Sequence, residues 1–214
     1  MSSSPRRALP RAAGWMIALE LAILTAAAVW ALSEFTNFDP ALRLRGMEFE
    51  YLTSSVVTAA QAWREHGYIP LWQPFFTYGE PLIEWGFSSV FNPFITAPVM
   101  MFGAINGIKV SLLIHAIIAA IGGWALGRVL GLGTIARMLL GALMLGRGNA
   151  PGLMSEGLFQ LAISQAYMPY ALVAAVGLIR FPDRRYPIIL MGVAFALLLY
   201  TGNIYYILPT ALIG

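Results

Sequence analysis

The stretch "GWMIALELAILTAAAVWAL", residues 14–32, decides the class of this protein because it carries a single charged residue, Glu20. A helix that crosses a membrane needs about 20 predominantly apolar residues, and this run comes close to that length. The rest of the chain follows the same trend. Its 214 residues are 59% hydrophobic and 11% charged, whereas a soluble domain has about 25% charged residues. The sequence therefore predicts an integral membrane protein.

The charges that flank this first apolar run predict its orientation. Arg6, Arg7 and Arg11 precede it, and basic residues mark the cytoplasmic side of a membrane helix. A cleaved signal peptide is the alternative, because residues 31–33 offer a site with small residues. The run is longer than a usual signal core and leads into more apolar sequence, so we interpret it as a retained anchor. Inside it, Glu20 is expected to form one paired polar contact within a helix bundle.

Further apolar segments predict the rest of the bundle. The segment 89–103 contains Pro93 and Pro98 and is too short to cross a membrane. If it lies at the interface, most arginines that follow fall on the cytoplasmic side, with Lys109 and Arg147 as exceptions. The expected spans are then Ile108–Leu130, Ile135–Gly146, Gln160–Ile179 and Tyr186–Thr201.

These segments predict an all-α, polytopic helical bundle of about five to six spans. Residues 1–13 form a cytoplasmic N-terminus and 14–32 the first span. Residues 33–107 form a long extracytoplasmic loop with amphipathic and interfacial helices, and 108–214 hold the remaining spans. The last apolar segment stops after about half a membrane thickness, so we expect the gene product to continue beyond Gly214.

Composition excludes several kinds of site. The net charge of +3 does not indicate nucleic-acid binding, because the arginines sit at the ends of apolar segments and no nucleic-acid motif accompanies them. The absence of cysteine excludes disulfides and thiolate metal sites. His66 and His115 are the only histidines, so a multi-histidine metal centre is also excluded. A carboxylate-bound divalent metal stays open, and no metal ligands are assigned.

Small and polar residues within the spans are interpreted as packing features. Gly123, Gly127 and Gly131 repeat every four residues and predict close contact between helices. His115 on the same segment is interpreted as a hydrogen-bonded packing residue. A transporter is the weakest functional alternative, because Glu20, His115 and the intramembrane glutamines form no evident relay and no inverted repeat is visible.

The stretch "RGMEFEYL", residues 45–52, begins the most distinctive part of the predicted outer loop. A helix is expected from Glu48 to His66, ended by Gly67, with an apolar face that includes Val56 and Trp63. Glu50 belongs to the polar face, whereas Glu48 falls near the edge of the apolar face, which suits a general base. Acidic residues in a first helical turn also interact favourably with the helix dipole, without any chemical role.

Aromatic, proline and acidic residues alternate after this helix, in "GYIPLWQPFFTYGEPLIEWGFSSVFNPF", residues 67–94. Prolines stiffen an irregular loop. Aromatic side chains stack on sugar rings or lie at the headgroup level of a membrane. The candidate substrate-binding residues in this stretch are Trp72, Tyr78, Glu80 and Glu84.

The order of these segments resembles the N-terminal half of membrane glycosyltransferases of the GT-C type, especially a bacterial YfhO-like branch. The resemblance covers most of residues 14–210, and "IPLWQPFFTYGEPL", residues 69–82, is its most specific piece. It implies transfer of a sugar from a polyprenyl-phosphate carrier to an acceptor at the extracytoplasmic face of the bacterial inner membrane. The implied catalytic base is Glu48 or Glu50, where the family usually has Asp. Arg43 and Arg45 lie near enough to assist the leaving phosphate, or serve as interfacial anchors.

The main alternative is a non-catalytic scaffold or accessory subunit of a larger membrane complex with the same kind of fold. The enzyme and the scaffold hypotheses predict different surroundings for the carboxylates of Glu48 and Glu50. A water-accessible cleft with room for a lipid phosphate favours the enzyme, and a site filled by side chains favours the scaffold.

Overall fold

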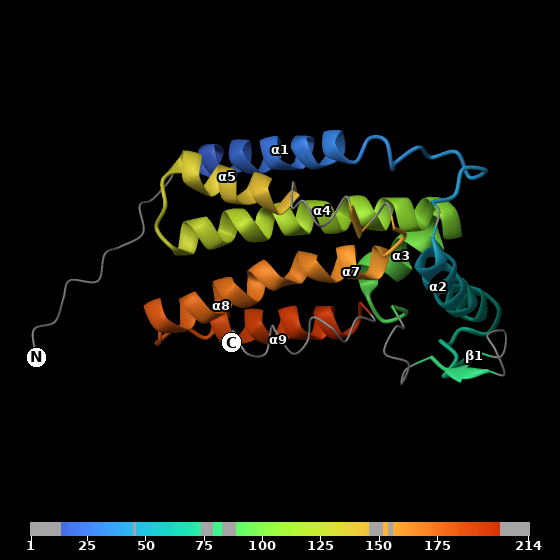
Figure 1. Ribbon diagram of the computed structural model, residues 1–214. Helices are drawn as coiled ribbons and strands as arrows, with labels where there is room; N and C mark the ends of the chain where they lie inside the picture. Colours follow the sequence, from blue (N-terminus) through green and yellow to red (C-terminus); the bar gives the residue numbers. More distant parts are fainter. Residues whose placement is uncertain are drawn as a thin grey trace, which may run out of the picture.

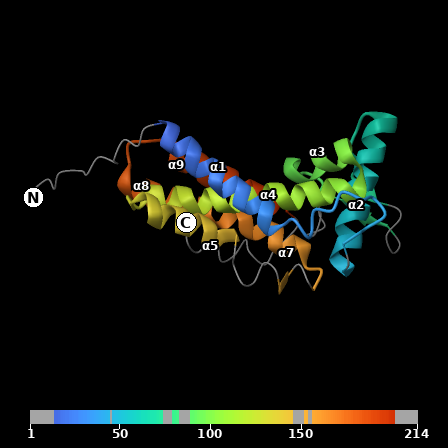
Figure 2. The same ribbon diagram turned by 90° about the horizontal axis from the view of Figure 1, so that it is seen from above.

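A computed structural model describes residues 14–44, 46–73, 79–82, 89–145, 152–153 and 156–201 of the chain, apart from the side chains of residues 47, 48, 51, 52, 73 and 80. The fold is helical, with one short pair of antiparallel strands at its margin. Long helices lie side by side along one direction, and a smaller group of elements covers one end of them (Figures 1 and 2).

The elongated bundle consists of helices that alternate in direction. α1 and α4 run antiparallel, α5 turns back along α4, and α8 and α9 form the opposite side (Figure 1). The bounds of these elements are α1 Gly14–Ala31, α4 Ala104–Val129, α5 Thr134–Leu145, α7 Phe159–Ser164, the 3₁₀ turn η1 Gln165–Tyr167, α8 Met168–Arg180 and α9 Tyr186–Leu199.

Three of the described helical segments are long and apolar enough to cross a membrane: Gly14–Ala31, Ala104–Val129 and Phe159–Arg180. At 1.5 Å per residue, the 26 residues of α4 extend about 39 Å, more than the ~30 Å hydrocarbon layer of a bilayer. The shorter apolar helices are α3 (Pro93–Phe102), α5 and α9. The chain thus has the architecture of a multi-pass membrane protein.

The third of these segments agrees with the expected span over residues 160–179, but it is not α-helical throughout. Phe159–Ser164 forms α7, and the chain then tightens into η1 before α8 begins. Pro169 in the first turn of α8 explains the break. Proline has no N–H to donate to the carbonyl four residues earlier, so the α-helical hydrogen-bond ladder stops there.

The centre of the bundle is α4, which packs against α1, α3, α5 and α8. A Cβ atom on Gly123 would lie 2.6 Å from the Leu140 carbonyl oxygen, and one on Gly127 would lie 2.7 Å from the Arg137 Cβ. The backbones of α4 and α5 therefore approach too closely for any larger residue, as the glycine spacing predicts. Gly131 lies beyond the end of α4 at φ +78° and ends the helix instead.

A buried ion pair joins α1 to α5, near the turn between α4 and α5. Arg137 Nε and Nη2 donate to the two carboxylate oxygens of Glu20 at 2.6 and 2.5 Å. Trp124 Nε1 donates to the same carboxylate at 2.7 Å. The expectation that Glu20 makes a paired polar contact is confirmed, and Arg137 is its partner. The pair is bidentate, which is the strongest arrangement available to a guanidinium and a carboxylate.

Arginines gather at one end of the bundle, where α4, α5, α8 and α9 meet in two turns (Figure 1). We call this the basic end. Arg180 Nη1 donates to the carbonyl oxygen of Val129 at 2.8 Å and so links the ends of α8 and α4. The arginines of this end are Arg128, Arg137, Arg180, Arg184 and Arg185. The opposite end carries α2 and α3, and we call it the α2 end (Figures 1 and 2).

The α2 helix, Met47–His66, lies across the α2 end of the bundle (Figure 1). Phe49, Val56 and Ala60 pack into a core with residues of α3, α4 and α7. Gly67 ends α2 in the left-handed conformation, as expected. Trp63, which the sequence places on the same apolar face, is 48% exposed, because the packed part of that face ends at Ala60.

Buried polar residues cross-link α3, α4 and η1 near the same end. Asn92 caps α3 by accepting a hydrogen bond from Phe94 N at 3.0 Å, and its Nδ2 donates to Tyr167 Oη at 3.1 Å. The Tyr167 hydroxyl is also 2.8 Å from His115 Nε2. His115 is thus a buried, hydrogen-bonded packing residue, as interpreted from the sequence.

Candidate functional site

The segment that leads from α1 into α2 is held by side chains from the first two turns of α4. The Lys109 ammonium donates to the carbonyl oxygens of Asn37 and, at 3.0 Å, Asp39. Asn106 Nδ2 donates to the carbonyl oxygen of Phe38 at 2.9 Å. Side-chain oxygens of Asn37 and Asp39 accept backbone N–H groups two residues onward, which is typical of tight polar turns. The path of residues 37–41 is therefore set by α4.

Gly46 joins this segment to α2. Its φ of +129° is a conformation that side chains with a Cβ rarely adopt, and its backbone lies directly against the backbone of Gly157. A Cβ on Gly46 would collide with that neighbour. The glycine thus permits a sharp entry into α2 and brings the first turns of the helix beside the preceding segment.

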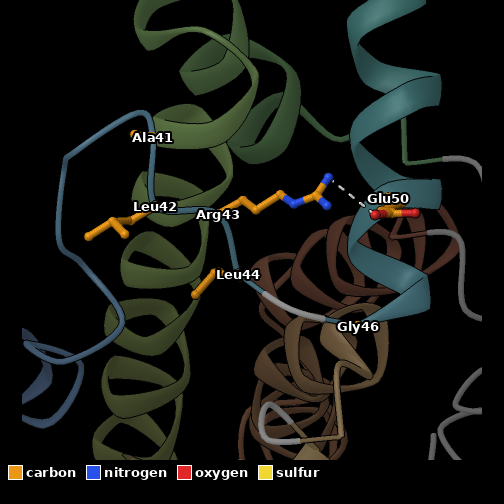
Figure 3. Close-up of a pocket in the computed structure, with 6 residues that line it drawn as sticks. All are labelled: Ala41, Leu42, Arg43, Leu44, Gly46 and Glu50. Atoms are coloured by element: carbon orange, nitrogen blue, oxygen red, sulfur yellow. Dashed lines mark ion pairs between the residues drawn. The ribbon is translucent and has the colours of Figure 1, made fainter.

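An open cleft of about 500 Å³ lies between the segment and the start of α2. Arg43 reaches across it toward Glu50, and Arg43 Nη1 lies 3.3 Å from Glu50 Oε1 (Figure 3). Both side chains are about two-thirds exposed, at 66% and 67%. The residues that line the cleft are Ala41, Leu42, Arg43, Leu44, Gly46 and Glu50.

The cleft offers an anion-binding group and a proton-accepting group side by side. An arginine guanidinium matches the oxygens of a phosphate, and a carboxylate is a common general base. An exposed ion pair contributes only about 0–1 kcal/mol, so an anionic ligand can separate Arg43 from Glu50 at small cost. The exposed side chain of Leu42 adds an apolar contact surface at the rim.

The structure places the predicted site residues in different ways. Arg43 and Glu50 are brought together as a pair. Glu48 lies in the first turn of α2, but its side chain falls outside the described part of the structure, so its preference as the base stays a prediction. Arg45, Tyr78 and Glu84 also lie outside the described residues.

Trp72 and Glu80 lie on the strand pair rather than in the cleft. β1 (Trp72–Gln73) pairs with β2 (Glu80–Pro81), with Trp72 opposite Pro81 and Gln73 opposite Glu80. Trp72 is 54% exposed. Leu82, next to the strand pair, packs against Ala59 of α2, which is nine residues or about 13 Å along the helix from Glu50. The structure therefore does not place Trp72 beside Arg43 and Glu50.

Among the described residues, no group of three or more His, Asp or Glu side chains is close enough to hold a metal ion. Sequence reasoning also missed two residues that shape the site, Lys109 and Asn106. Lys109 did carry a signal, because it is an exception to the charge pattern that predicts the orientation of the spans. Its burial at 1% exposure shows that it holds the loop rather than marking membrane orientation.

Comparison with known proteins adds no relative: no protein-family model, curated protein or solved structure matches this chain.

Proposed function

We propose that this protein is a membrane glycosyltransferase that moves a sugar from a polyprenyl-phosphate carrier to an acceptor at the α2 end of the bundle. The observation that carries the proposal is the open cleft in which Arg43 and Glu50 face each other. It lies directly after the first membrane helix and at the start of the amphipathic α2. A lipid-linked substrate requires this position, because its phosphate lies at the membrane surface and its chain in the bilayer.

In the proposed reaction, a carboxylate of the cleft accepts the proton of the acceptor hydroxyl. The hydroxyl oxygen then attacks the anomeric carbon of the sugar. The bond between that carbon and the phosphate oxygen breaks, and its electron pair leaves with the polyprenyl phosphate. Arg43 stabilises the negative charge that develops on the leaving phosphate. Glu50 and Glu48 are the two candidate bases.

The proposal includes a membrane orientation. The basic end lies in the cytoplasm with the N-terminus, and the α2 end faces outward across the inner membrane of a bacterium. The bundle has five to six crossings, of which the shorter helices α5 and α9 are two. The arginines at one end and the cleft at the other support this orientation.

A non-catalytic subunit of a larger membrane complex is the second candidate. Only 17% of α1 is buried inside the bundle, against 50% of the corresponding window of α4. Large apolar side chains of α1, such as Trp15, Leu19 and Trp30, are exposed. This surface suits a partner helix as well as lipid, and a scaffold subunit would use it for assembly.

A transfer assay with purified protein and a panel of polyprenyl-phosphate sugars tests the proposal. The variants Glu50→Gln and Glu48→Gln remove the candidate bases, and Arg43→Gln removes the phosphate contact. Glu65→Gln is the matched control, because Glu65 is an exposed acid near the far end of the same helix. We expect one carboxylate variant to lose transfer about 100-fold or more, with Glu65→Gln unaffected. No turnover with any donor, or equal turnover in all variants, supports the scaffold instead.

A further inference from the structure

We propose that the turn between α8 and α9, residues 180–185, binds the headgroup phosphate of an anionic phospholipid. This turn lies at the basic end, away from the α2 end (Figure 1), and the inference does not depend on the proposed transferase activity. The turn carries the guanidinium groups of Arg180, Arg184 and Arg185 and the carboxylate of Asp183. Three positive charges less one negative charge leave a net charge of +2.

Arg180 is held in place for such a role. Its Nη1 donates to the carbonyl oxygen of Val129, 2.8 Å away, which fixes the guanidinium against the end of α4. A guanidinium has five N–H donors, so further donors remain for a ligand. The side chain is exposed, as are Arg184 and Arg185.

The surrounding charges favour an anion at this place. Arg128 adds a positive charge in the last turn of α4, where its guanidinium lies 5.5 Å from the centre of the Trp124 ring. Arg128 Nη1 is buried and has no hydrogen-bond partner among the described residues. Among the described residues, the basic end carries two acidic side chains, Glu20 and Asp183. The charge of Glu20 is neutralised by its ion pair with Arg137. The potential around the turn is therefore positive.

Apolar side chains beside the turn point to a lipid rather than to a free anion. Ile179 is 83% exposed at the end of α8, and Ile188 and Ile189 are 63% and 64% exposed at the start of α9. These isoleucines lie beside the arginines, on the two helices that lead from the turn into the membrane-embedded part of the bundle. A phospholipid can place its phosphate on the arginines and its acyl chains on these isoleucines. Basic sites between membrane helices recognise anionic headgroups in this way.

The test measures how strongly spin-labelled phosphatidylglycerol associates with the protein in phosphatidylcholine vesicles, relative to spin-labelled phosphatidylcholine. Each arginine near a headgroup strengthens binding about fivefold, so we expect the preference for phosphatidylglycerol to disappear in Arg184→Gln/Arg185→Gln. The Arg184→Lys/Arg185→Lys variant keeps both charges and should keep most of the preference. Arg64→Gln is the matched control, because it removes an exposed arginine of α2 that belongs to neither proposed site.

Four results would overturn the proposal. The wild-type protein shows no preference for phosphatidylglycerol, or Arg64→Gln lowers the preference as much as the double glutamine variant does. The third is displacement of the labelled lipid by millimolar inorganic phosphate, because the site would then recognise the free anion and not a lipid. Loss of preference in the lysine variant together with normal unfolding behaviour would also count against it.

Discussion

Arg137 and Glu20 lie 117 positions apart in the sequence, yet two guanidinium nitrogens of Arg137 donate to the two carboxylate oxygens of Glu20 at 2.5 and 2.6 Å. Both side chains are almost completely buried. The pair holds α1 against α4 and α5, and little else in α1 is buried. A neutral pair also explains how two charges are accommodated within an apolar bundle.

Removing one member of this pair should be strongly destabilising. Glu20→Met leaves the Arg137 guanidinium buried without a counter-charge, which is expected to lower the free energy of unfolding by about 3–5 kcal/mol. Glu20→Met combined with Arg137→Met removes both charges and should recover most of that loss. Denaturant titration in detergent micelles measures both. If the double variant loses as much stability as the two single variants added together, the ion pair does not act as a unit.

The contact between α4 and α5 predicts a sharp difference between two glycines. Gly123→Ala brings a Cβ within 2.6 Å of the Leu140 carbonyl oxygen, and overpacking of this kind lowers stability by about 1–3 kcal/mol. Gly192 in α9 has nothing within 4 Å of the same position, so Gly192→Ala should be neutral or stabilise by up to about 1 kcal/mol. The same titration compares them. Equal effects at the two sites would contradict the close packing of α4 on α5.

Lys109 should hold the segment that carries Arg43 in a fixed conformation. Lys109→Met removes the hydrogen bonds to the carbonyl oxygens of Asn37 and Asp39, a loss of roughly 1.5–3 kcal/mol for a charged donor. We expect limited proteolysis to cut residues 37–44 several-fold faster in this variant. Arg64→Met is the control, because Arg64 contacts the Met100 carbonyl oxygen instead. Unchanged cleavage in Lys109→Met would show that the segment is held by other contacts.

The proposed orientation can be tested cleanly because the chain has no cysteine. Leu42→Cys at the α2 end should react with a membrane-impermeant maleimide in intact bacterial cells. Gly133→Cys, in the turn at the basic end, should react only after the membrane is made permeable. Both positions are exposed, so accessibility depends on the side of the membrane alone. The reverse pattern would place the basic end outside.

The sequence predicted the helices better than it predicted their partners. The bounds of α2 and the glycine contacts of α4 follow from local periodicity and from glycine at a helix end, which need no knowledge of tertiary structure. The partner of Glu20 does not, because Arg137 lies 117 positions away and no local pattern relates the two residues. The break before α8 was also missed, although Pro169 supplied the signal. A proline disturbs the helical turn that precedes it, but the apolar composition of this segment indicated only a membrane span.

The candidate site was also predictable only where residues close in the sequence determine the contact. Arg43 and Glu50 are seven positions apart, so a turn followed by a helix brings them together, and their proximity was expected. The role of Lys109 depends on a contact across about 70 positions, which periodicity does not reveal. Trp72 was grouped with the site because it follows α2 in sequence, but α2 is long enough to separate them.

Photocrosslinking with a polyprenyl-phosphate sugar that carries a diazirine beside its phosphate tests the central claim most directly. Mass spectrometry of the labelled protein identifies the attachment site. We predict adducts within residues 41–50, lost when unlabelled donor is added in excess and strongly reduced in Arg43→Gln. Adducts confined to the turn 180–185, or labelling that the unlabelled donor does not displace, would contradict a donor site in the cleft between Arg43 and Glu50.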